Sequence, residues 1–335
     1  GMDFRHIRTY RSRSDRDTSQ GYGWDFNFNT RLPQLDPGNA ANRSRVLIEG
    51  GTSIASAFGA APNNGFETPA QLFAELREIT PGVFRILDRD GTARFFDNVG
   101  HLTRVVDLHG NTMEFFYGTA GDPSESRDLL TKVRDTLGRD IRYVYYPGNI
   151  GGGPRLRHLI DFTGRQVTYT YTSNGDLESV TSPRVLTPAF NQFPNGKTER
   201  YTYLSGQGVP ELNHNLEKII RPNQNVTGSE QGATDGTPVG TEVTRVTYDA
   251  LDRVKTEFWG SGTVTYNYLT GPSAEEPATA THDAIVRKTQ VTDRNGNLTE
   301  YGINGQSAVT VKREFVGGGK VFETHTLHDR NNQVI

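Results

Sequence analysis

The sequence predicts a mainly β protein, built as a long antiparallel sheet of repeated β-hairpins. Three observations predict it: a recurring Asp-x-x-Gly turn motif, alternation of apolar and polar residues beside that motif, and a composition rich in glycine and aromatic residues. The 335 residues include 37 glycines, 14 tyrosines and 17 phenylalanines. Glycine supplies turns and aromatic residues favour strands, so this composition suits a sheet with many turns.

The Asp-x-x-Gly motif occurs five times in the same setting. An aliphatic residue lies five positions before each glycine, and an aromatic residue lies five positions after it. The turn residues are Asp88, Gly91, Asp107, Gly110, Asp135, Gly138, Asp161, Gly164, Asp293 and Gly296. The aromatic residues are Phe96, Phe115, Tyr143, Tyr169 and Tyr301. Copies with matching flanks form an internal repeat, and an internal repeat takes precedence in predicting the fold.

Each repeat is predicted to be a strand, a turn and a second strand. Asp at the first position and Gly at the fourth suit a type I turn, in which the carboxylate accepts hydrogen bonds from backbone N–H groups. After the turn, apolar and polar residues alternate, as at Val167, Tyr169 and Tyr171, which is typical of a strand. We expect the apolar residue before each turn to face the aromatic residue after it. Because an isolated hairpin is only marginally stable in water, the hairpins must pair edge to edge into one sheet.

One segment departs from the strand pattern. Thr68 suits a helix cap and Pro69 suits the first helical position. The apolar residues that follow have helical spacing and are Leu72, Phe73, Leu76 and Ile79. We therefore predict a short helix near residues 69–79 that packs on the sheet. The predicted organisation is an N-terminal region of lead-in strands plus this helix over residues 1–80. A hairpin strip follows over residues 81–335, continuous with the lead-in strands.

Several segments carry a resemblance to a known family. The repeats are Asp107-Leu-His-Gly110-Asn111 with Tyr117, Asp161-Phe-Thr-Gly164-Arg165 with Tyr171, and Tyr248-Asp249-Ala-Leu-Asp-Arg253. Before them stand Arg8-Thr9-Tyr10-Arg11-Ser12, Gly21-Tyr22-Gly23-Trp24 and Arg31-Leu32, followed by a block from Asp88 to Leu102. These segments resemble the YD repeats of RHS proteins and the lead-in that precedes them in bacterial members. The resemblance covers the chain from Arg8 to the end. The family includes bacterial polymorphic toxins, insecticidal toxin complexes and teneurins.

The resemblance implies an architecture and a role. In that family, strips of antiparallel hairpins spiral into a hollow shell that encloses a toxic C-terminal segment. This sequence shows no counterpart of the C-terminal core region where bacterial members release their toxin, and its last residues begin another repeat without its aromatic residue. Gly1-Met2 has the form of a tag remnant. We therefore expect a monomeric piece of a longer protein, exported by bacteria and secreted or held at the cell surface. Its expected partners are further repeats and a toxin cargo of the same polypeptide.

A search for chemical sites predicts no catalytic, cofactor-binding or metal-binding residues. The turns at Asp88 and Asp293 share part of a calcium-loop pattern. The second, however, has Leu298 where that loop needs Gly and Asn304 where it needs Glu. The chain has no cysteine and no Gly-x-Ser-x-Gly motif, so it offers neither a thiol nucleophile nor a serine elbow. We predict that it is not an enzyme.

The net charge and the hydropathy of the sequence indicate which classes of partner the chain can bind. A net charge of −3 argues against nucleic acid or a membrane surface as the main partner. No apolar run approaches the roughly 20 residues of a membrane-spanning helix. Aspartates interrupt the arginine-rich start, which favours a salt-bridged entry strand over an anion-binding patch. The arginines concerned are Arg5, Arg8, Arg11, Arg13 and Arg16.

Two functions of different class remain. The first is structural: a non-catalytic segment of a toxin-enclosing β-shell. The second is binding: a cell-surface glycan-binding or adhesion module, because aromatic-rich β faces stack on sugar rings. A shell wall needs its aromatic side chains sequestered between hairpins, whereas a glycan-binding surface needs several of them exposed together. Tyr169 and Tyr171 are the reporters that distinguish the two functions.

Overall fold

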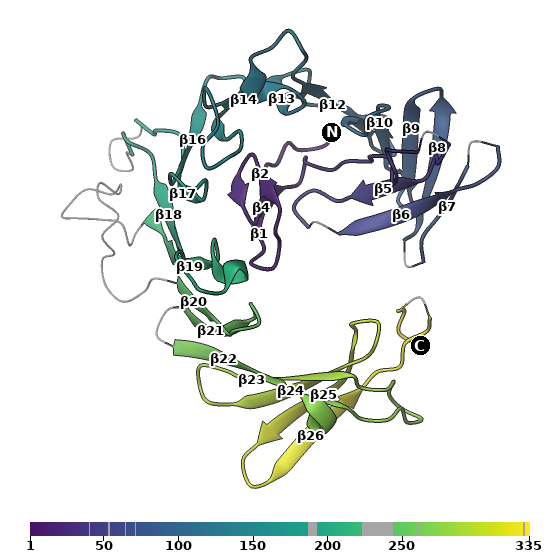
Figure 1. Cartoon of the computed structure of the whole chain (residues 1–335), viewed down its shortest axis with the longest axis vertical. Coiled ribbons are helices and arrows are strands. Elements are labelled where there is room, and N and C mark those ends of the chain that lie inside the picture. Colours follow the sequence, from purple (N-terminus) through teal and green to yellow (C-terminus); the bar gives the residue numbers. More distant parts are fainter. Residues whose placement is uncertain are drawn as a thin grey trace.

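A single antiparallel sheet dominates the fold (Figure 1). The computed structural model describes residues 1–335 except 40, 53, 64, 71, 187–192, 223–243, 260, 261 and 331. Strands make up 49% of the chain and short helical turns 4%, and the main sheet has 19 strands. The predicted mainly β fold class is confirmed.

The main sheet runs from β8 to β26, and each strand pairs antiparallel with its neighbours in sequence. Its strands are β8 (Ala74–Thr80), β9 (Val83–Asp88), β10 (Ala93–Phe96), β11 (Leu102–Val106), β12 (Thr112–Tyr117), β13 (Leu130–Arg134), β14 (Asp140–Tyr145), β15 (Leu156–Ile160), β16 (Gln166–Tyr171), β17 (Leu177–Thr181), β18 (Thr198–Tyr203), β19 (Leu216–Ile220), β20 (Thr244–Tyr248), β21 (Val254–Trp259), β22 (Gly262–Leu269), β23 (Arg287–Thr292), β24 (Leu298–Ile303), β25 (Val309–Val316) and β26 (Lys320–His325). Described connections hold the 3-10 helices η1 (Ser124–Ser126), η3 (Pro210–Leu212) and η5 (Gly271–Ala274).

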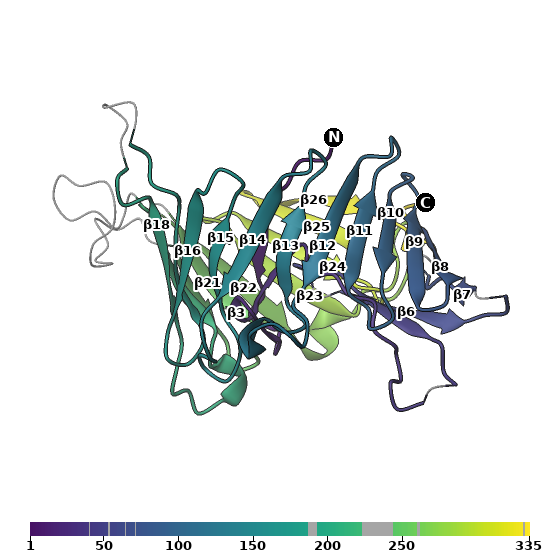
Figure 2. The same cartoon turned by 90° about the horizontal axis from the view of Figure 1, so that it is seen from above.

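The main sheet is strongly curved and open. Its terminal strands β8 and β26 pair with β9 and β25, and no pairing joins β8 to β26 in the part of the chain that the structure describes. Figure 1 shows the sheet curving around the N-terminal segment, and Figure 2 shows the strands side by side from above. The curvature gives the sheet a concave face and a convex face.

Residues 1–73, which we call the lead-in, precede the main sheet. Figure 1 shows β1, β2 and β4 inside the curve of the sheet, and β5, β6 and β7 beside β8 and β9 at its edge, where Gly65 bridges to Arg77. The lead-in strands form small sheets of their own, β1 with β4, β2 with β3, and β5 with β6 and β7. Buried lead-in side chains such as Trp24, Phe26 and Leu32 share one hydrophobic core with the strands from β8 to β19. The lead-in strands are β1 (Arg8–Tyr10), β2 (Asp17–Thr18), β3 (Gly21–Tyr22), β4 (Trp24–Phe26), β5 (Arg45–Ile48), β6 (Ala55–Ala60) and β7 (Phe66–Glu67).

The predicted helix near residues 69–79 is wrong. Ala74–Thr80 form strand β8, which pairs with β9 along its length. Leu76 is buried, whereas Phe73 and Ile79 are exposed, so the apolar residues do not share one helical face. Pairing with β9 and burial of Leu76 outweigh the weak local preference for a helix.

The register of the hairpins also corrects an expectation. The aromatic residue after each turn does not lie opposite the apolar residue of its own hairpin. Val133 pairs with Ile141 across its own turn, whereas Phe115 pairs with Val133 and Tyr143 pairs with Leu159 of the following hairpin. The aromatic residues therefore join one hairpin to the next.

Candidate functional site

Four of the five predicted turns share one hydrogen-bonded geometry. At Asp161, one carboxylate oxygen accepts the N–H groups of Thr163 (2.8 Å) and Arg165 (3.0 Å), and the other accepts Arg165 Nε (2.8 Å). Gly164 donates its N–H to the Asp161 carbonyl (2.9 Å) with a φ of +83°, a conformation that glycine adopts without strain. Equivalent contacts occur at Asp107, Asp135 and Asp293.

In the fifth turn, the carboxylate of Asp88 does not accept the backbone N–H groups of the turn. Asp88 forms an ion pair with Arg94 (2.9 Å), and Asp90 accepts the N–H of Thr92 (2.9 Å) instead. All five turns follow strands β9, β11, β13, β15 and β23, which run in the same direction, so they lie on one rim of the sheet. Their carboxylates are engaged within their own hairpins, which is a structural role.

The aromatic residues of the repeat form a row on the concave face. Phe96, Phe115, Tyr143 and Tyr169 are buried, whereas Tyr301, on β24, is half-buried. The lead-in covers the first part of this row. Its Phe28 ring lies 5.2 Å from that of Phe115, and its Phe26 ring lies 6.0 Å from that of Tyr143.

A second row, which we call the tyrosine ladder, follows the first. Each member stands at a β-bulge, opposite an aliphatic residue of the next strand. Three of the tyrosine hydroxyls donate a hydrogen bond to the backbone carbonyl at the preceding bulge of the sheet. These bonds are Tyr145 to Leu130 (2.7 Å), Tyr203 to Leu177 (2.7 Å) and Tyr248 to Leu216 (2.9 Å). Each such tyrosine therefore ties neighbouring hairpins together. The ladder members are Tyr117, Tyr145, Tyr171, Tyr203 and Tyr248, opposite Leu130, Leu156, Leu177, Leu216 and Val254.

The lead-in takes part in the tyrosine ladder at two points. The Ser19 carbonyl accepts hydrogen bonds from the Tyr171 hydroxyl (3.1 Å) and from the Leu156 N–H (2.7 Å). Trp24 Nε1 donates to the Tyr203 hydroxyl (2.7 Å). The lead-in is thus bound to the sheet by directed hydrogen bonds as well as by apolar contact.

Replacing Tyr203 with Phe should lower the free energy of unfolding by about 1–3 kcal/mol. The change removes the acceptor of the Trp24 N–H and the donor to the Leu177 carbonyl (both 2.7 Å), and the Trp24 and Leu177 side chains are buried. The measurement is urea unfolding, with Tyr266→Phe as control. Among the described residues the Tyr266 hydroxyl hydrogen-bonds to Glu257 alone, at 3.4 Å, so its loss should change stability by about 0.5 kcal/mol or less. Equal effects of the two substitutions would contradict the role assigned to the ladder.

Arg8 anchors the lead-in through aromatic contacts. Its guanidinium lies 5.5 Å from the ring centre of Trp24, 5.8 Å from that of Tyr169 and 5.9 Å from that of Tyr201. Its Nη2 also donates to the Tyr201 hydroxyl (3.3 Å). Cation–π attraction of this kind is strongest where water is excluded. Arg8 therefore helps to hold the lead-in against the sheet, which is a structural role.

Arg155 supplies a buried ionic link between the sheet and the lead-in. Its side chain is fully buried, and its Nη2 lies 2.9 Å from an Asp17 carboxylate oxygen. Its Nε donates to the Gly175 carbonyl and its Nη1 to the Thr18 carbonyl, both at 3.1 Å. Burial raises the pKa of Asp17, and the attraction of Arg155 offsets this only in part.

His6 of the lead-in packs among aromatic side chains. Its ring centre lies 5.1 Å from that of Phe26 and 5.6 Å from that of Tyr143, and its Nδ1 is 3.1 Å from the Tyr143 hydroxyl. Burial, with a smaller effect of nearby Arg8, lowers the pKa of His6 to about 3. The imidazole is therefore neutral in the folded chain at ordinary pH.

Replacing Tyr169 with Ala should lower the free energy of unfolding by about 3–5 kcal/mol, as expected for truncating a core aromatic residue. The side chain is 2% exposed and lies between Arg8 of the lead-in and Val180 of β17. Phe162→Ala is the matched control because Phe162 is exposed at a turn, and it should cost about 1 kcal/mol or less. Thermal and urea unfolding measure both. Unchanged stability of the Tyr169 variant, together with loss of sugar binding, would contradict a wall role.

Beyond the lead-in, the concave face is partly open. Tyr266, Tyr268 and Tyr301 are half-buried on this face. A groove of about 650 Å³ separates the Tyr10–Arg16 loop from β20 and β21 and is lined in part by Tyr248. The lead-in therefore covers the first part of the concave face, whereas the part over the later strands is accessible to solvent.

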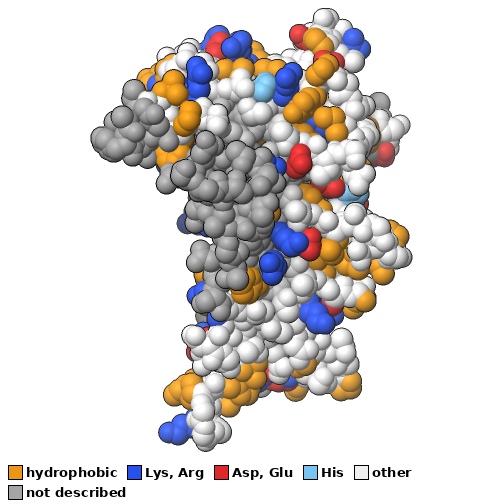
Figure 3. Space-filling model, turned by 90° about the vertical axis from the view of Figure 1, so that its left-hand side faces the viewer, with side chains coloured by type: hydrophobic (Ala, Val, Ile, Leu, Met, Phe, Trp, Pro, Cys, Tyr) orange, Lys and Arg blue, Asp and Glu red, His pale blue; other side chains and the backbone are white. Residues whose placement is uncertain are grey.

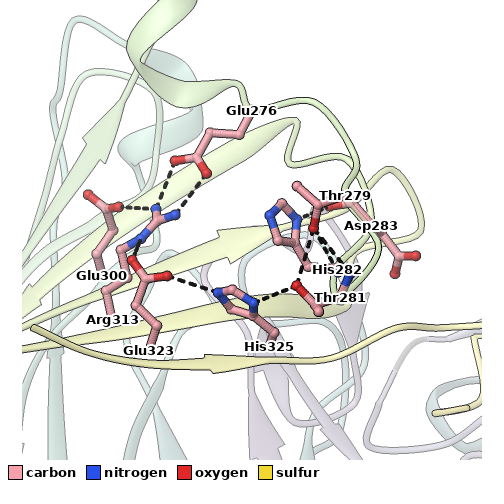
Figure 4. Close-up of polar contacts among 9 residues, drawn as sticks. All are labelled: Glu276, Thr279, Thr281, His282, Asp283, Glu300, Arg313, Glu323 and His325. Carbon is pink, nitrogen blue, oxygen red and sulfur yellow. Dashed lines mark hydrogen bonds and ion pairs between the residues drawn. The ribbon is translucent and has the colours of Figure 1, made fainter.

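A charged cluster lies on the C-terminal strands of the sheet (Figure 4). Arg313 contacts Glu276 (2.8 Å), Glu300 (3.0 Å) and Glu323 (2.8 Å). Glu276 lies in the connection between β22 and β23, so the cluster fastens that connection across the strands. Hydrogen bonds from Arg313 are the main reason that the pKa of Glu276 falls to about 2. Lys288 also contacts Glu276 (2.6 Å) and His325 contacts Glu323 (2.9 Å), so these carboxylates are held by several partners, which suits a structural role.

Several histidines among the described residues lie beside carboxylates, as at His214, His325 and His328. His214 Nδ1 lies 2.7 Å from an Asp176 carboxylate oxygen, but the same ring stacks on Tyr22 of the lead-in at 4.0 Å. In the part of the chain that the structure describes, no three or more His, Cys, Asp or Glu side chains are placed to hold a metal ion. Nor does that part contain a helix long and apolar enough to cross a membrane.

Comparisons with known proteins find distant structural similarities to this chain. No protein-family model matches the sequence, and no curated protein matches it. The crystal structure of TcdB2-TccC3-TEV is similar over 94% of this chain and 20% of that chain, with 14% identity and a TM-score of 0.25. The crystal structure of TcdB2-TccC3 is similar over the same shares, with 13% identity and a TM-score of 0.27. This chain thus spans 20% of the solved chains that it matches.

The hydrogen bonds of the tyrosine ladder were not predicted, although Tyr117 and Tyr171 were placed in the repeats and the sequence carries a signal for the ladder. A tyrosine stands seven positions after the glycine of several turns, two beyond the aromatic residue of the first row. The pairs are Gly110 and Tyr117, Gly138 and Tyr145, Gly164 and Tyr171, and Gly196 and Tyr203. The motif Asp97-Asn-Val-Gly100, which belongs to the block from Asp88 to Leu102 that resembles the first repeats, was not counted among the five turns. Its aspartate accepts N–H groups from Val99, Gly100 and His101.

Proposed function

We propose that this chain is a non-catalytic wall segment of an RHS/YD-repeat β-shell, which encloses and delivers a toxic C-terminal segment of the same polypeptide. The observation that carries the proposal is the sequestration of the reporter side chains. Tyr169 is 2% exposed, and the Tyr171 hydroxyl is bound to the lead-in carbonyl of Ser19. Aromatic residues held in this way stabilise a wall and are unavailable to stack on a ligand.

The proposed wall acts through its backbone. Every strand between β9 and β25 has a partner on both sides, so an enclosed chain finds no free strand edge within the wall. The turns, the aromatic row and the tyrosine ladder hold the curvature collectively, and no side chain is assigned a chemical step. A protein of this kind would be exported and would act at the cell surface or outside the cell.

A second candidate function is glycan binding. Tyr266, Tyr268 and Tyr301 are half-buried together on the concave face that the lead-in leaves uncovered, and accessible tyrosines stack on sugar rings. Binding of the intact chain to immobilised glycans, lost on Tyr266→Ala with Tyr268→Ala while the unfolding curve is kept, would favour this function over the wall.

The native reading frame on both sides of the chain tests the wall proposal. Further Asp-x-x-Gly hairpins after Ile335, followed by an unrelated tail, are the expected result. A stop codon soon after Ile335 would overturn the proposal, because a wall segment needs further wall and a cargo.

A further inference from the structure

The convex face of the sheet changes in chemistry from one group of strands to the next. Side chains alternate between the two faces of a strand, so Thr168, next to the concave Tyr169, lies on the convex face. Over β16–β18 and β20–β23, residues directly opposite one another on this face are threonines. They are Thr168, Thr181 and Thr198, and then Thr247, Thr256, Thr265 and Thr292. Figure 3 looks onto this side, where uncharged polar side chains and backbone, drawn white, predominate. Because threonine favours strands, the convex face can meet water there without charged residues.

The same face over β9–β14 carries cations and aromatic rings instead. One row of directly opposite residues, from β9 to β14, consists of Arg85, Phe95, Arg104, Glu114, Arg134 and Asp140. A second row beside it consists of Phe116, Lys132 and Arg142. We call the two rows the basic patch. Cations outnumber carboxylates in it, whereas the whole chain has a net charge of −3. Figure 1 shows these strands on the outer curve of the sheet.

The aromatic rings of the basic patch support its cations. The Arg104 guanidinium lies 4.1 Å from the ring centre of Phe95, and Lys132 Nζ lies 4.0 Å from that of Phe116. Both rings are half-buried. Cation–π contacts of this kind hold long side chains in place, and binding then costs less side-chain entropy. The cations are therefore preorganised on a rigid sheet.

Part of this positive charge is not neutralised by the chain itself. Arg134 pairs with Asp140 at 2.8 Å, and Glu114 lies 3.9 Å from the same arginine. Arg104 and Arg142 are exposed, and no carboxylate lies within 4.0 Å of either guanidinium in the part of the chain that the structure describes. Arginine binds a carboxylate through two parallel hydrogen bonds. Both groups are thus available to carboxylates of another molecule.

We propose that the basic patch is a docking surface for an acidic protein partner, whose carboxylates pair with Arg104 and Arg142. Protein interfaces are enriched in arginine and aromatic residues, and complementary charge steers partners together. The surface lies on the outer face of the sheet, so the proposal goes beyond the wall proposal and does not rest on it.

Two other classes of anionic partner fit the basic patch less well. Single-stranded nucleic acid needs open ring faces for its bases to stack on, and cations cover Phe95 and Phe116. A lipid surface takes up exposed apolar side chains. The large apolar side chains that are exposed in the described part of the chain include none from the two rows.

Binding of fluorescently labelled poly-L-glutamate to the intact chain, followed by anisotropy, tests the basic patch. The native chain should bind, with an affinity that falls as salt is added. Arg104→Gln with Arg142→Gln should weaken binding about tenfold. The control, Arg245→Gln with Arg287→Gln, removes two exposed arginines of β20 and β23 and changes the net charge equally. It should leave the affinity within about twofold. Equal losses in the two double variants, or no binding by the native chain, would overturn the proposal.

Three further probes test the class of partner at the same salt concentration. They are single-stranded DNA, a sulfated polysaccharide and vesicles that contain phosphatidylserine. The native chain should bind each of them more weakly than poly-L-glutamate, and tighter binding to any of them would contradict an acidic protein as the partner. Sedimentation of the native chain alone should show no association that depends on Arg104 and Arg142. Such an association would make a second copy the partner and would also contradict the proposal.

Discussion

Acidification from about pH 7 to pH 4.5 should reduce the free energy of unfolding by about 2 kcal/mol through His6 alone. In the folded chain, burial and the nearby Arg8 lower the pKa of His6 to about 3. In the unfolded chain its pKa returns to the ordinary histidine value of about 6.5. Between these values the unfolded state binds more protons. The stabilisation by neutral His6 is therefore complete above pH 6.5 and declines as the pH falls towards 3.

The measurement is the unfolding free energy as a function of pH for the native chain, His6→Gln and His109→Gln. His6→Gln removes the titrating group, so its curve should be flatter between about pH 6.5 and 4.5. His109 lies in an exposed turn, and its variant should follow the native curve. Carboxylates with lowered pKa values, such as Glu276 and Asp293, also lose stabilisation as the pH falls towards the pKa values of the unfolded chain, but they do so in all three proteins, so the difference between the curves reports His6. Parallel curves for all three proteins would contradict the assignment.

Replacing Asp17 with Ala should lower the free energy of unfolding by about 3–5 kcal/mol. The substitution leaves the guanidinium of Arg155 fully buried without its carboxylate partner, which now lies 2.9 Å away. The large effect reflects the uncompensated charge. The intact pair contributes much less, because burial already disfavours ionised Asp17 and raises its pKa.

Asp3→Ala is the matched control for this experiment. Asp3 pairs with Arg5 at 3.6 Å, but both side chains are largely exposed, and exposed pairs contribute little. Urea unfolding should therefore separate the two variants clearly. Similar stabilities of Asp17→Ala and Asp3→Ala would mean that Arg155 is not the link between the sheet and the lead-in.

Local chemistry made the hairpins predictable. At Asp161 and Gly164 the turn depends on a carboxylate, a glycine and the residues between them, all within one short segment. The degenerate turn at Asp249 follows the same logic, with Asp252 taking the positive φ (56°) that glycine takes elsewhere. The alternation around Tyr169 likewise indicates a strand without knowledge of its partners.

Long-range contacts explain what the sequence did not reveal. β8 became a strand because β9 pairs with it and Leu76 is buried, although local spacing favoured a helix. The contact between Arg155 and Asp17 spans 138 positions, and no periodicity connects them. The position of the lead-in on the concave face depends on such contacts. A single sequence therefore predicted its strands but not their location.

The most direct test of the wall account uses the native polypeptide that contains this chain together with any segment that follows it. The measurement is limited proteolysis of that downstream segment, joined to the intact wall and as a separate chain, with its toxicity to cells measured in parallel. The account predicts that the joined segment resists cleavage and is inactive, and that Asp17→Ala, which loosens the lead-in, makes it cleavable. Cleavage at the same rate in the joined and separate forms would contradict the account.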